Sequence, residues 1–180
     1  SPPLQYEPVF VGARYRVLGI DPGLTLCGYA VIDASGPSSG VAVALGVIRT
    51  PPKVALPWRL AMLREELCRL ITDFTPDVVA VEQVFFQVNV RTAMGVGQAS
   101  GLALAEAAHA GCDVVQYTPN QVKDAVAGWG AAPKEQVQRM VKARLGLSTV
   151  PQPADAADAA ALALCHLAMA PMRAAIAGAQ

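Results

Sequence analysis

Short apolar runs in the first part of the chain predict three consecutive strands. They cover residues 16–21, 27–34 and 41–49, and the turn-forming residues of 35–40 separate the second run from the third. Strands that follow one another with short links pair in the antiparallel direction. We therefore expect these three segments to form an antiparallel meander.

A helical period replaces this pattern after Pro51, Pro52 and Pro57. Apolar residues at helical spacing predict an amphipathic helix, which we expect Pro76 to end. These residues are Leu60, Leu63, Leu67, Leu70 and Phe74. Residues 78–81 are continuously apolar and largely β-branched, which is typical of a parallel strand buried on both faces.

The remaining pattern mixes helices with one more strand. We expect a helix over 89–109, a strand over 113–117, a helix over 121–128, a helix begun by Pro133, and a final helix from Ala154 that Pro171 stops. The helix over 89–109 consists mostly of small residues. Because glycine costs about 1 kcal/mol at a helical position, this helix must pack closely against another backbone, either the sheet or a second subunit.

Together these elements predict an α/β fold with a mixed five-stranded sheet, an antiparallel meander followed by parallel strands, flanked by helices. Residues 15–172 are expected to form a single domain. Residues 1–14 contain Pro2, Pro3 and Pro8 without any hydrophobic period and predict a flexible N-terminal extension, and 173–180 predict a C-terminal tail.

Composition supports one folded domain and gives no overall sign of a charged partner. The chain has 180 residues, of which 53% are hydrophobic, and 14 basic residues balance 14 acidic ones. Without the four acids discussed below, 14 basic residues face 10 acidic ones. Five basic residues also fall close together, which permits a local basic surface for nucleic acid; they are Lys123, Lys134, Arg139, Lys142 and Arg144.

The distribution of cysteines and apolar segments bears on location. The four cysteines form no CxxC pair and the chain has two histidines, which argues against zinc and for a reducing cytoplasm over a disulfide framework. The N-terminus lacks the apolar core of a signal peptide, and the apolar run over 159–170 is too short to cross a bilayer. We expect a cytoplasmic protein with no membrane partner.

Four acids occupy positions where a metal site would form. Asp21 ends the first strand before a Pro22-Gly23 turn, and Glu82 ends the predicted parallel strand. Carboxylates at the ends of neighbouring strands meet at one edge of a sheet, where α/β proteins bind ligands. Asp155 and Asp158 share one face in the first turn of the final helix.

Each acid also has an ordinary structural explanation. Asp21 could belong to a simple turn, and helix capping and the helix macrodipole favour Asp155 and Asp158 in a first turn. The final helix is, however, almost wholly apolar beyond them, and two close carboxylates repel each other unless they are protonated or bind metal. The metal-site hypothesis therefore leads, and His166, about two turns beyond Asp158, is expected to pack within the helix without a catalytic role.

Several separate motifs then identify a family. The chain contains Gly19-Ile20-Asp21-Pro22-Gly23, Val81-Glu82-Gln83-Val84-Phe85, Gly97-Gln98-Ala99, Gln121-Val122-Lys123 and Ala154-Asp155-Ala156-Ala157-Asp158-Ala159. In order and spacing these motifs closely resemble the RuvC family of Holliday-junction resolvases, which are crossover junction endodeoxyribonucleases with a ribonuclease-H-like fold. The resemblance runs from about residue 16 to about residue 170, nearly the whole chain.

The resemblance implies roles for ten residues. Asp21, Glu82, Asp155 and Asp158 match the family's catalytic acids, which bind divalent ions, with Asp21 touching both. Phe85 matches an aromatic residue that stacks on a base near the crossover, and Lys123 and Lys134 match residues that contact the DNA backbone. Phe86, Asn89 and Arg91 are further expected DNA contacts.

The resemblance also implies the reaction and its partners. We expect two Mg²⁺ or Mn²⁺ ions in each active site and paired nicks in opposite strands of a four-way DNA junction, leaving 5′-phosphate and 3′-hydroxyl ends during recombination and repair. A homodimer through the helix over 89–109 would present two such sites to the junction. The RuvA–RuvB branch-migration complex is the further partner that family resemblance suggests.

Other classes fit part of the pattern. The segment from Asp21 to Thr25 also matches the DxGxT phosphate loop of actin-like and sugar-kinase ATPases. Those proteins need a second, similar domain, for which 180 residues leave no room, and they do not explain the other three acids. A ribonuclease-H-like nuclease acting on RNA shares the fold and the first acid, so RNA stays an alternative to DNA as the substrate. A junction-binding protein without catalysis is disfavoured because all four acids are present.

Overall fold

A computed structural model gives the structure of residues 14–83 and 89–178. The meander predicted from the first three apolar runs is confirmed. Strand β1 (Arg16–Asp21) pairs antiparallel with β2 (Leu26–Gly36), and β2 pairs antiparallel with β3 (Ser39–Arg49). The β-branched and aliphatic residues of these strands place alternate side chains on the two faces of the sheet.

Two parallel strands complete the sheet on the other side of β1. Strand β4 (Val78–Glu82) pairs parallel with β1, and β5 (Asp113–Tyr117) pairs parallel with β4, which gives the order β3-β2-β1-β4-β5. The four residues of β4 that precede Glu82 are buried, as the continuous apolar run predicts. The expected mixed five-stranded sheet is confirmed, and β1 lies at its centre.

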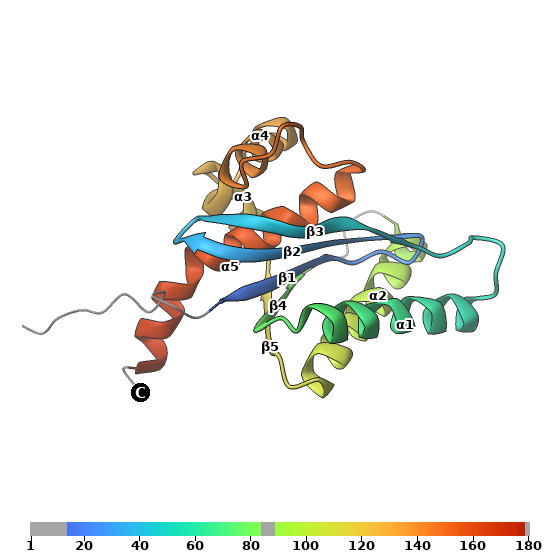
Figure 1. Cartoon of the computed structure of the whole chain (residues 1–180). Coiled ribbons are helices and arrows are strands. Elements are labelled where there is room, and N and C mark those ends of the chain that lie inside the picture. Colours follow the sequence, from blue (N-terminus) through green and yellow to red (C-terminus); the bar gives the residue numbers. More distant parts are fainter. Residues whose placement is uncertain (1–13, 84–88, 179–180) are drawn as a thin grey trace, which may run out of the picture.

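Helices cover both faces of the sheet (Figure 1). One face carries α1 (Leu56–Phe74) and α2 (Val90–His109), with Leu18, Leu63 and Ala103 in the shared core. The opposite face carries α5 (Ala154–Gly178), with Val17 and Leu162 in its core, and α3 and α4 pack against α5. Helix α3 spans Pro119–Ala127 and α4 spans Lys134–Arg144.

Several element boundaries differ from the prediction, among them that of α3, which starts two residues earlier than expected. Strands β2 and β3 extend through most of the expected loop at 35–40, so that Pro37 and Ser38 alone turn the hairpin. Pro57 lies within the first turn of α1, where its missing N–H is not needed. Pro133 is the N-cap of α4 and precedes its first turn.

The expectation that Pro171 stops the last helix is wrong. Helix α5 continues through Pro171 to Gly178, and residues 171–175 of this extension are exposed. Proline removes one helical hydrogen bond, and exposure lets water satisfy the freed carbonyl group, so the helix continues there at a small cost. Residues 173–178, expected as a tail, are therefore helical.

Two sequence-based expectations concern the ends of the chain and the membrane. Residues 1–13 and 179–180 lie outside the described part, so the proposed N-terminal extension and domain boundaries stay predictions. Across residues 14–83 and 89–178, no helix has the length and apolar character needed to span a membrane.

Candidate active site

Asp21 and Glu82 lie side by side at the edge of the sheet where β1 and β4 end. The two strands are parallel neighbours, with Ile20 opposite Val81, so the next residue of each strand emerges at the same edge. The two carboxyl groups are hydrogen-bonded to each other. Such a bond forms when one of the two carboxyl groups carries a proton, because two ionised carboxylates have no donor and repel each other.

Burial and neighbouring charge both oppose ionisation of this pair. Burial and, after it, the negative charges of Glu82, Asp158 and Asp155 together raise the pKa of Asp21 to about 9. Burial also raises the pKa of Glu82, while its hydrogen bond with Asp21 counteracts that rise. A cation placed among these groups would counteract both shifts, because its positive charge favours the ionised carboxylates.

Helix α5 brings Asp155 and Asp158 to the same place because two strands lack side chains where the helix crosses them. Gly28 lies opposite Asp21 in the β1–β2 register, and a Cβ atom there would collide with the backbone of Asp155. One turn further along α5, Gly19 of β1 meets the backbone of Ala159 in the same way. This close approach of backbone to backbone aims the first turn of α5 at the end of β1.

Two lysines border the acids, as the sequence predicts. The Lys134 Nζ atom lies 3.1 Å from Asp158 Oδ2 and donates a hydrogen bond to it, which raises the pKa of Lys134. The positive charges of Lys134 and Lys123 act on Glu82 and favour its ionised form. Arg144, part of the same basic segment, donates to the Ala125 carbonyl at 3.1 Å and links α4 to α3.

The donor set fits a hard divalent cation. Every acidic side chain at this edge offers carboxylate oxygen, the ligand that Mg²⁺ and Mn²⁺ prefer. In the part of the chain that the structure describes, no three acidic, histidine or cysteine side chains already converge as the ligands of one ion. The carboxylates repel one another at this edge, and a divalent cation would offset that repulsion.

Comparison with known proteins matches this arrangement to one family. The family model described as crossover junction endodeoxyribonuclease RuvC matches residues 17–166, a segment that contains all four acids and both lysines. The chain belongs to the RuvC family. This membership confirms the expected enzyme class, an endodeoxyribonuclease of crossover junctions, and the expected ribonuclease-H-like fold.

Individual RuvC proteins are similar over most of their length. The RuvC of Salinispora arenicola is 52% identical over 152 residues, which cover 84% of this chain and 87% of the relative. The RuvC of Alkaliphilus oremlandii is 48% identical over 150 residues, which cover 83% and 91%.

A solved structure supports the same conclusion. Thermus thermophilus RuvC in complex with a Holliday junction substrate superimposes with a TM-score of 0.84 at 38% identity, over 88% of this chain and 96% of that one. The yeast mitochondrial Holliday junction resolvase Ydc2 superimposes with a TM-score of 0.65 at 16% identity and shows the shared fold alone.

The other RuvC-type residues predicted from sequence are only partly placed. Phe85 and Phe86 lie outside the described residues. The Asn89 side chain caps α2 by accepting hydrogen bonds from the backbone N–H groups of Arg91 and Thr92. The Arg91 side chain is exposed and lines a pocket of about 590 Å³ next to the turn that follows Asp21.

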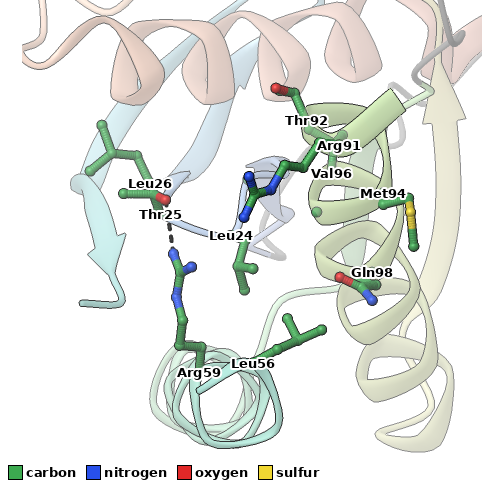
Figure 2. Close-up of a pocket in the computed structure, with 12 residues that line it drawn as sticks. Leu24, Thr25, Leu26, Leu56, Arg59, Arg91, Thr92, Met94, Val96 and Gln98 are labelled. Carbon is green, nitrogen blue, oxygen red and sulfur yellow. Dashed lines mark hydrogen bonds between the residues drawn. The ribbon is translucent and has the colours of Figure 1, made fainter. Parts of the chain in front are cut away.

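Sequence reasoning missed Arg59, which lines the same pocket as Thr25 of the DxGxT-like segment. Arg59 Nη2 donates to Thr25 Oγ1 at 2.8 Å (Figure 2), although 34 positions separate the two residues. In the sequence, Arg59 is one polar residue at the start of an amphipathic helix, where exposed arginines are common. Only the contact across the fold distinguishes it.

Proposed function

We propose that this chain resolves Holliday junctions by metal-dependent hydrolysis of one phosphodiester bond in each of two opposite strands, leaving 5′-phosphate and 3′-hydroxyl ends. The observation that supports this most directly is the electrostatic coupling of Asp21 to Glu82, Asp155 and Asp158 at one edge of the sheet. Membership of the crossover junction endodeoxyribonuclease family points to the same reaction.

The four acids are proposed to hold two divalent ions, Mg²⁺ or Mn²⁺. When bound, such ions activate the attacking water and stabilise the charge on the leaving 3′-oxygen. Asp21, in the middle of the set, is the proposed shared ligand, since the other three carboxylates all act on its pKa. Because the pKa of Asp21 is raised, its carboxyl group tends to hold a proton, and a bound cation would replace that proton.

Lys134 is the residue best placed to stabilise charge on the phosphate. It already contacts Asp158 and acts on Glu82, so its ammonium group reaches both sides of the acid cluster. Lys134 and Lys123 are proposed to bind backbone phosphates next to the cut, which orients the strand across the acids. For Phe85, Phe86, Asn89 and Arg91, DNA contact is proposed from the family resemblance.

A homodimer through α2 would supply the second nick. Exposed apolar or small residues recur along α2 at spacings of three or four, which places them on one side of the helix; they are Val90, Met94, Gly97, Gly101, Ala105 and Ala108. Val90 is 79% exposed and Met94 is 59% exposed, as expected for a face that a second copy covers. A two-fold dimer matches the approximate symmetry of a four-way junction.

The remaining partners and location follow from the proposed substrate. A branch-migration complex of the RuvA–RuvB type is proposed to deliver the junction. The relatives are bacterial proteins, so we propose the cytoplasm, which contains the chromosome, as the site of action.

Cleavage of matched substrates tests the proposal. The purified chain is mixed with Mg²⁺ or Mn²⁺ and a synthetic four-way junction, a linear duplex of the same sequence, or an RNA–DNA hybrid. We expect paired nicks in the junction alone, with ends that DNA ligase reseals. Equal cutting of the duplex or the hybrid would overturn the assignment, and cutting of the hybrid alone would favour a ribonuclease.

A further inference from the structure

The pocket next to the sheet edge that carries Asp21 and Glu82 has no assigned role. It lies between the turn that follows Asp21 and the first turns of two helices, α1 and α2 (Figure 2). Gly23 forms part of its wall two residues beyond Asp21, so the pocket adjoins the acid cluster. Its volume of about 590 Å³ is in the range of sites that bind small molecules or single nucleotides.

Two arginines enter this pocket from different helices. Figure 2 shows Arg59 extending from α1 and Arg91 from α2, with both guanidinium groups in the space beside Leu24. Arg59 Nε donates to Thr50 Oγ1 at 3.0 Å and Nη2 donates to Thr25 Oγ1 at 2.8 Å. The two threonine hydroxyls orient the guanidinium group without neutralising its charge.

Positive charge in the pocket is not balanced by acid. Among residues 14–83 and 89–178, neither Arg59 nor Arg91 forms an ion pair with a carboxylate. The first turns of α1 and α2 contain no acidic residue, so both helix dipoles add positive potential at this end. Two uncompensated cations that point into one cavity favour an anion between them.

The rest of the wall is suited to an anion that carries an apolar group. Leu24 and Leu56 present aliphatic surface beside the guanidinium groups, and Gln98 adds an amide. A free inorganic anion would gain nothing from that surface, whereas the base and sugar of a nucleotide would cover it. A second copy of α2 would bury the two charges without a partner, which is costly.

We propose that this pocket binds a nucleotide of the DNA strand next to the scissile phosphate, with its phosphate between Arg59 and Arg91 and its nucleoside against the apolar wall. The inference rests on the proposed function, since DNA must already lie across the acids. The pocket would fix the strand on the side of Asp21 formed by the Pro22-Gly23 turn, opposite the lysines of α3 and α4. The position of cleavage would then depend on two groups of DNA contacts, the arginines of this pocket and the lysines of α3 and α4.

Neutral phosphates in the DNA test this assignment. Binding of fluorescent four-way junctions is measured in the Asp21→Asn background, so that the strands stay uncut, with single methylphosphonates placed at each of the three positions on either side of the cut. The variants are Arg59→Gln, Arg59→Lys and Arg91→Gln. The control is Arg69→Gln, which removes a charge from α1 at a residue already paired with Glu65 and Glu66.

On the unmodified junction we expect about a tenfold loss of affinity for Arg59→Gln and Arg91→Gln, as removal of a charge-assisted contact predicts. Both variants should lower the salt slope of binding by about one phosphate contact. At one methylphosphonate position, each arginine variant should bind the modified junction as tightly as the Asp21→Asn protein does. The neutral group has already removed the phosphate charge that the arginine would contact. Arg59→Lys should recover part of the affinity, and Arg69→Gln should leave the slope unchanged.

Three results would overturn the inference. One is an unchanged salt slope in Arg91→Gln, a substitution at an exposed position that should leave the fold intact. Another is that the arginine substitutions reduce junction affinity by the same factor at every methylphosphonate position. The third is dissociation of a DNA-free dimer by these variants, which would assign the pocket to the subunit interface. In each case a retained preference for junction over duplex would leave the proposed function standing, whereas loss of that preference in the unsubstituted protein would refute it.

Discussion

At Asp21 the requirements of the fold and of the chemistry oppose each other. The residue ends the central strand, where burial and three neighbouring carboxylates raise its pKa to about 9. At pH values between the ordinary pKa of an aspartate and about 9, the folded chain binds a proton that the unfolded chain has released. The free energy of unfolding therefore falls as the pH rises through this range. The site is therefore destabilising until a cation arrives.

Replacement of Asp21 by asparagine separates these two effects. Asp21→Asn should melt at the same temperature or higher because it removes a repelling charge with little change of shape. It should bind a four-way junction normally and cut it at least about a hundredfold more slowly, because a proposed metal ligand is lost. Calorimetry, binding and cleavage assays measure the three quantities.

Asp73→Asn, at an exposed position on α1, is the matched control and should retain cleavage. Normal cleavage by Asp21→Asn would remove Asp21 from the site.

His166 is a second titratable residue in the interior, and its role is structural. Tyr15 and Tyr117 hydroxyls each lie 2.8 Å from one of its ring nitrogens, so one hydroxyl donates and the other accepts. Burial and, to a smaller extent, the charge of Arg173 lower the pKa of His166 to about 4. The sequence-based expectation that His166 packs within α5 is confirmed, since its exposed fraction is 4%.

This buried imidazole predicts a loss of stability in mild acid. Between the unfolded pKa near 6.5 and the folded value, the unfolded chain binds the extra proton, so the free energy of unfolding falls as pH falls. Urea titrations should show that His166 accounts for a decrease of about 2 kcal/mol from pH 7 to pH 5.

His166→Gln keeps a hydrogen-bonding side chain that does not titrate, and it should flatten this part of the curve. His109→Gln, which replaces the exposed histidine at the end of α2, should not. Parallel pH curves for the wild type and His166→Gln would contradict the prediction.

At the scale of elements, the contact of α5 with β1 and β2 positions half of the acid cluster. Gly19 and Gly28 allow the backbone of α5 to touch the strands, and this contact lies next to Asp155. Interiors pack too tightly to absorb an added methyl group where backbone faces backbone. The geometry of the site is therefore linked to two residues that carry no functional group.

An alanine at Gly28 should damage both stability and cleavage. The methyl group would displace the start of α5, at a cost of about 1–3 kcal/mol in unfolding free energy. A shift of about 1 Å in Asp155 should lower cleavage by about a hundredfold. Thermal melting and single-turnover cleavage measure these effects.

Gly130→Ala is the control, because a Cβ there would lie 3.6 Å from the nearest atom, in ordinary contact. If Gly28→Ala cut as fast as Gly130→Ala, the close approach would not position the site.

Helix α2 has its own test at this scale. A Cβ at Gly101 would meet nothing within 4 Å in the single chain, and this glycine lies in the middle of the exposed apolar face. Gly101→Glu should raise helix stability by up to about 1 kcal/mol in the isolated chain and dissociate the proposed dimer. Sedimentation velocity distinguishes monomer from dimer.

Ala61→Glu, at an exposed position on α1, is the control and should stay dimeric. A dimer that survives Gly101→Glu would move the interface away from this face.

For the whole molecule, the arrangement of charge matters more than its sum. The net charge is zero, yet the acids gather at one edge of the sheet while Lys123 and Lys134 border them. Net charge alone predicts little dependence of DNA binding on salt. Separated charge predicts that phosphates bind the basic border and that metal ions occupy the acidic centre.

Salt titrations decide between these views. In the Asp21→Asn background, the logarithm of the junction dissociation constant should rise linearly with the logarithm of salt concentration, and Lys123→Gln should reduce the slope by about 0.9. A linear duplex of equal length should bind more weakly at every salt concentration. A slope near zero would show that phosphates contribute little and would contradict the charge-separation argument.

Local sequence pattern is sufficient to predict the type and order of the elements. Apolar periodicity is a local property, so β4 was predicted as a doubly buried strand and α1 as an amphipathic helix. Motif spacing likewise predicts Asp21, Glu82, Asp155 and Asp158 as the metal-binding acids, because the type and spacing of these residues can be read without the fold. Boundaries at Pro57 and Pro171 were wrong where exposure and helix position override the usual effect of proline.

Which residues from distant parts of the chain meet is visible only in the folded structure. That Gly28 contacts Asp155, that Tyr15 and Tyr117 enclose His166, and that Arg59 and Arg91 share a pocket are all consequences of layer packing. Neither glycine nor an exposed arginine carries a local signal of such a role. The energy of these arrangements comes from desolvation and from charges held close together, and both depend on three-dimensional distance, which the order of residues does not contain.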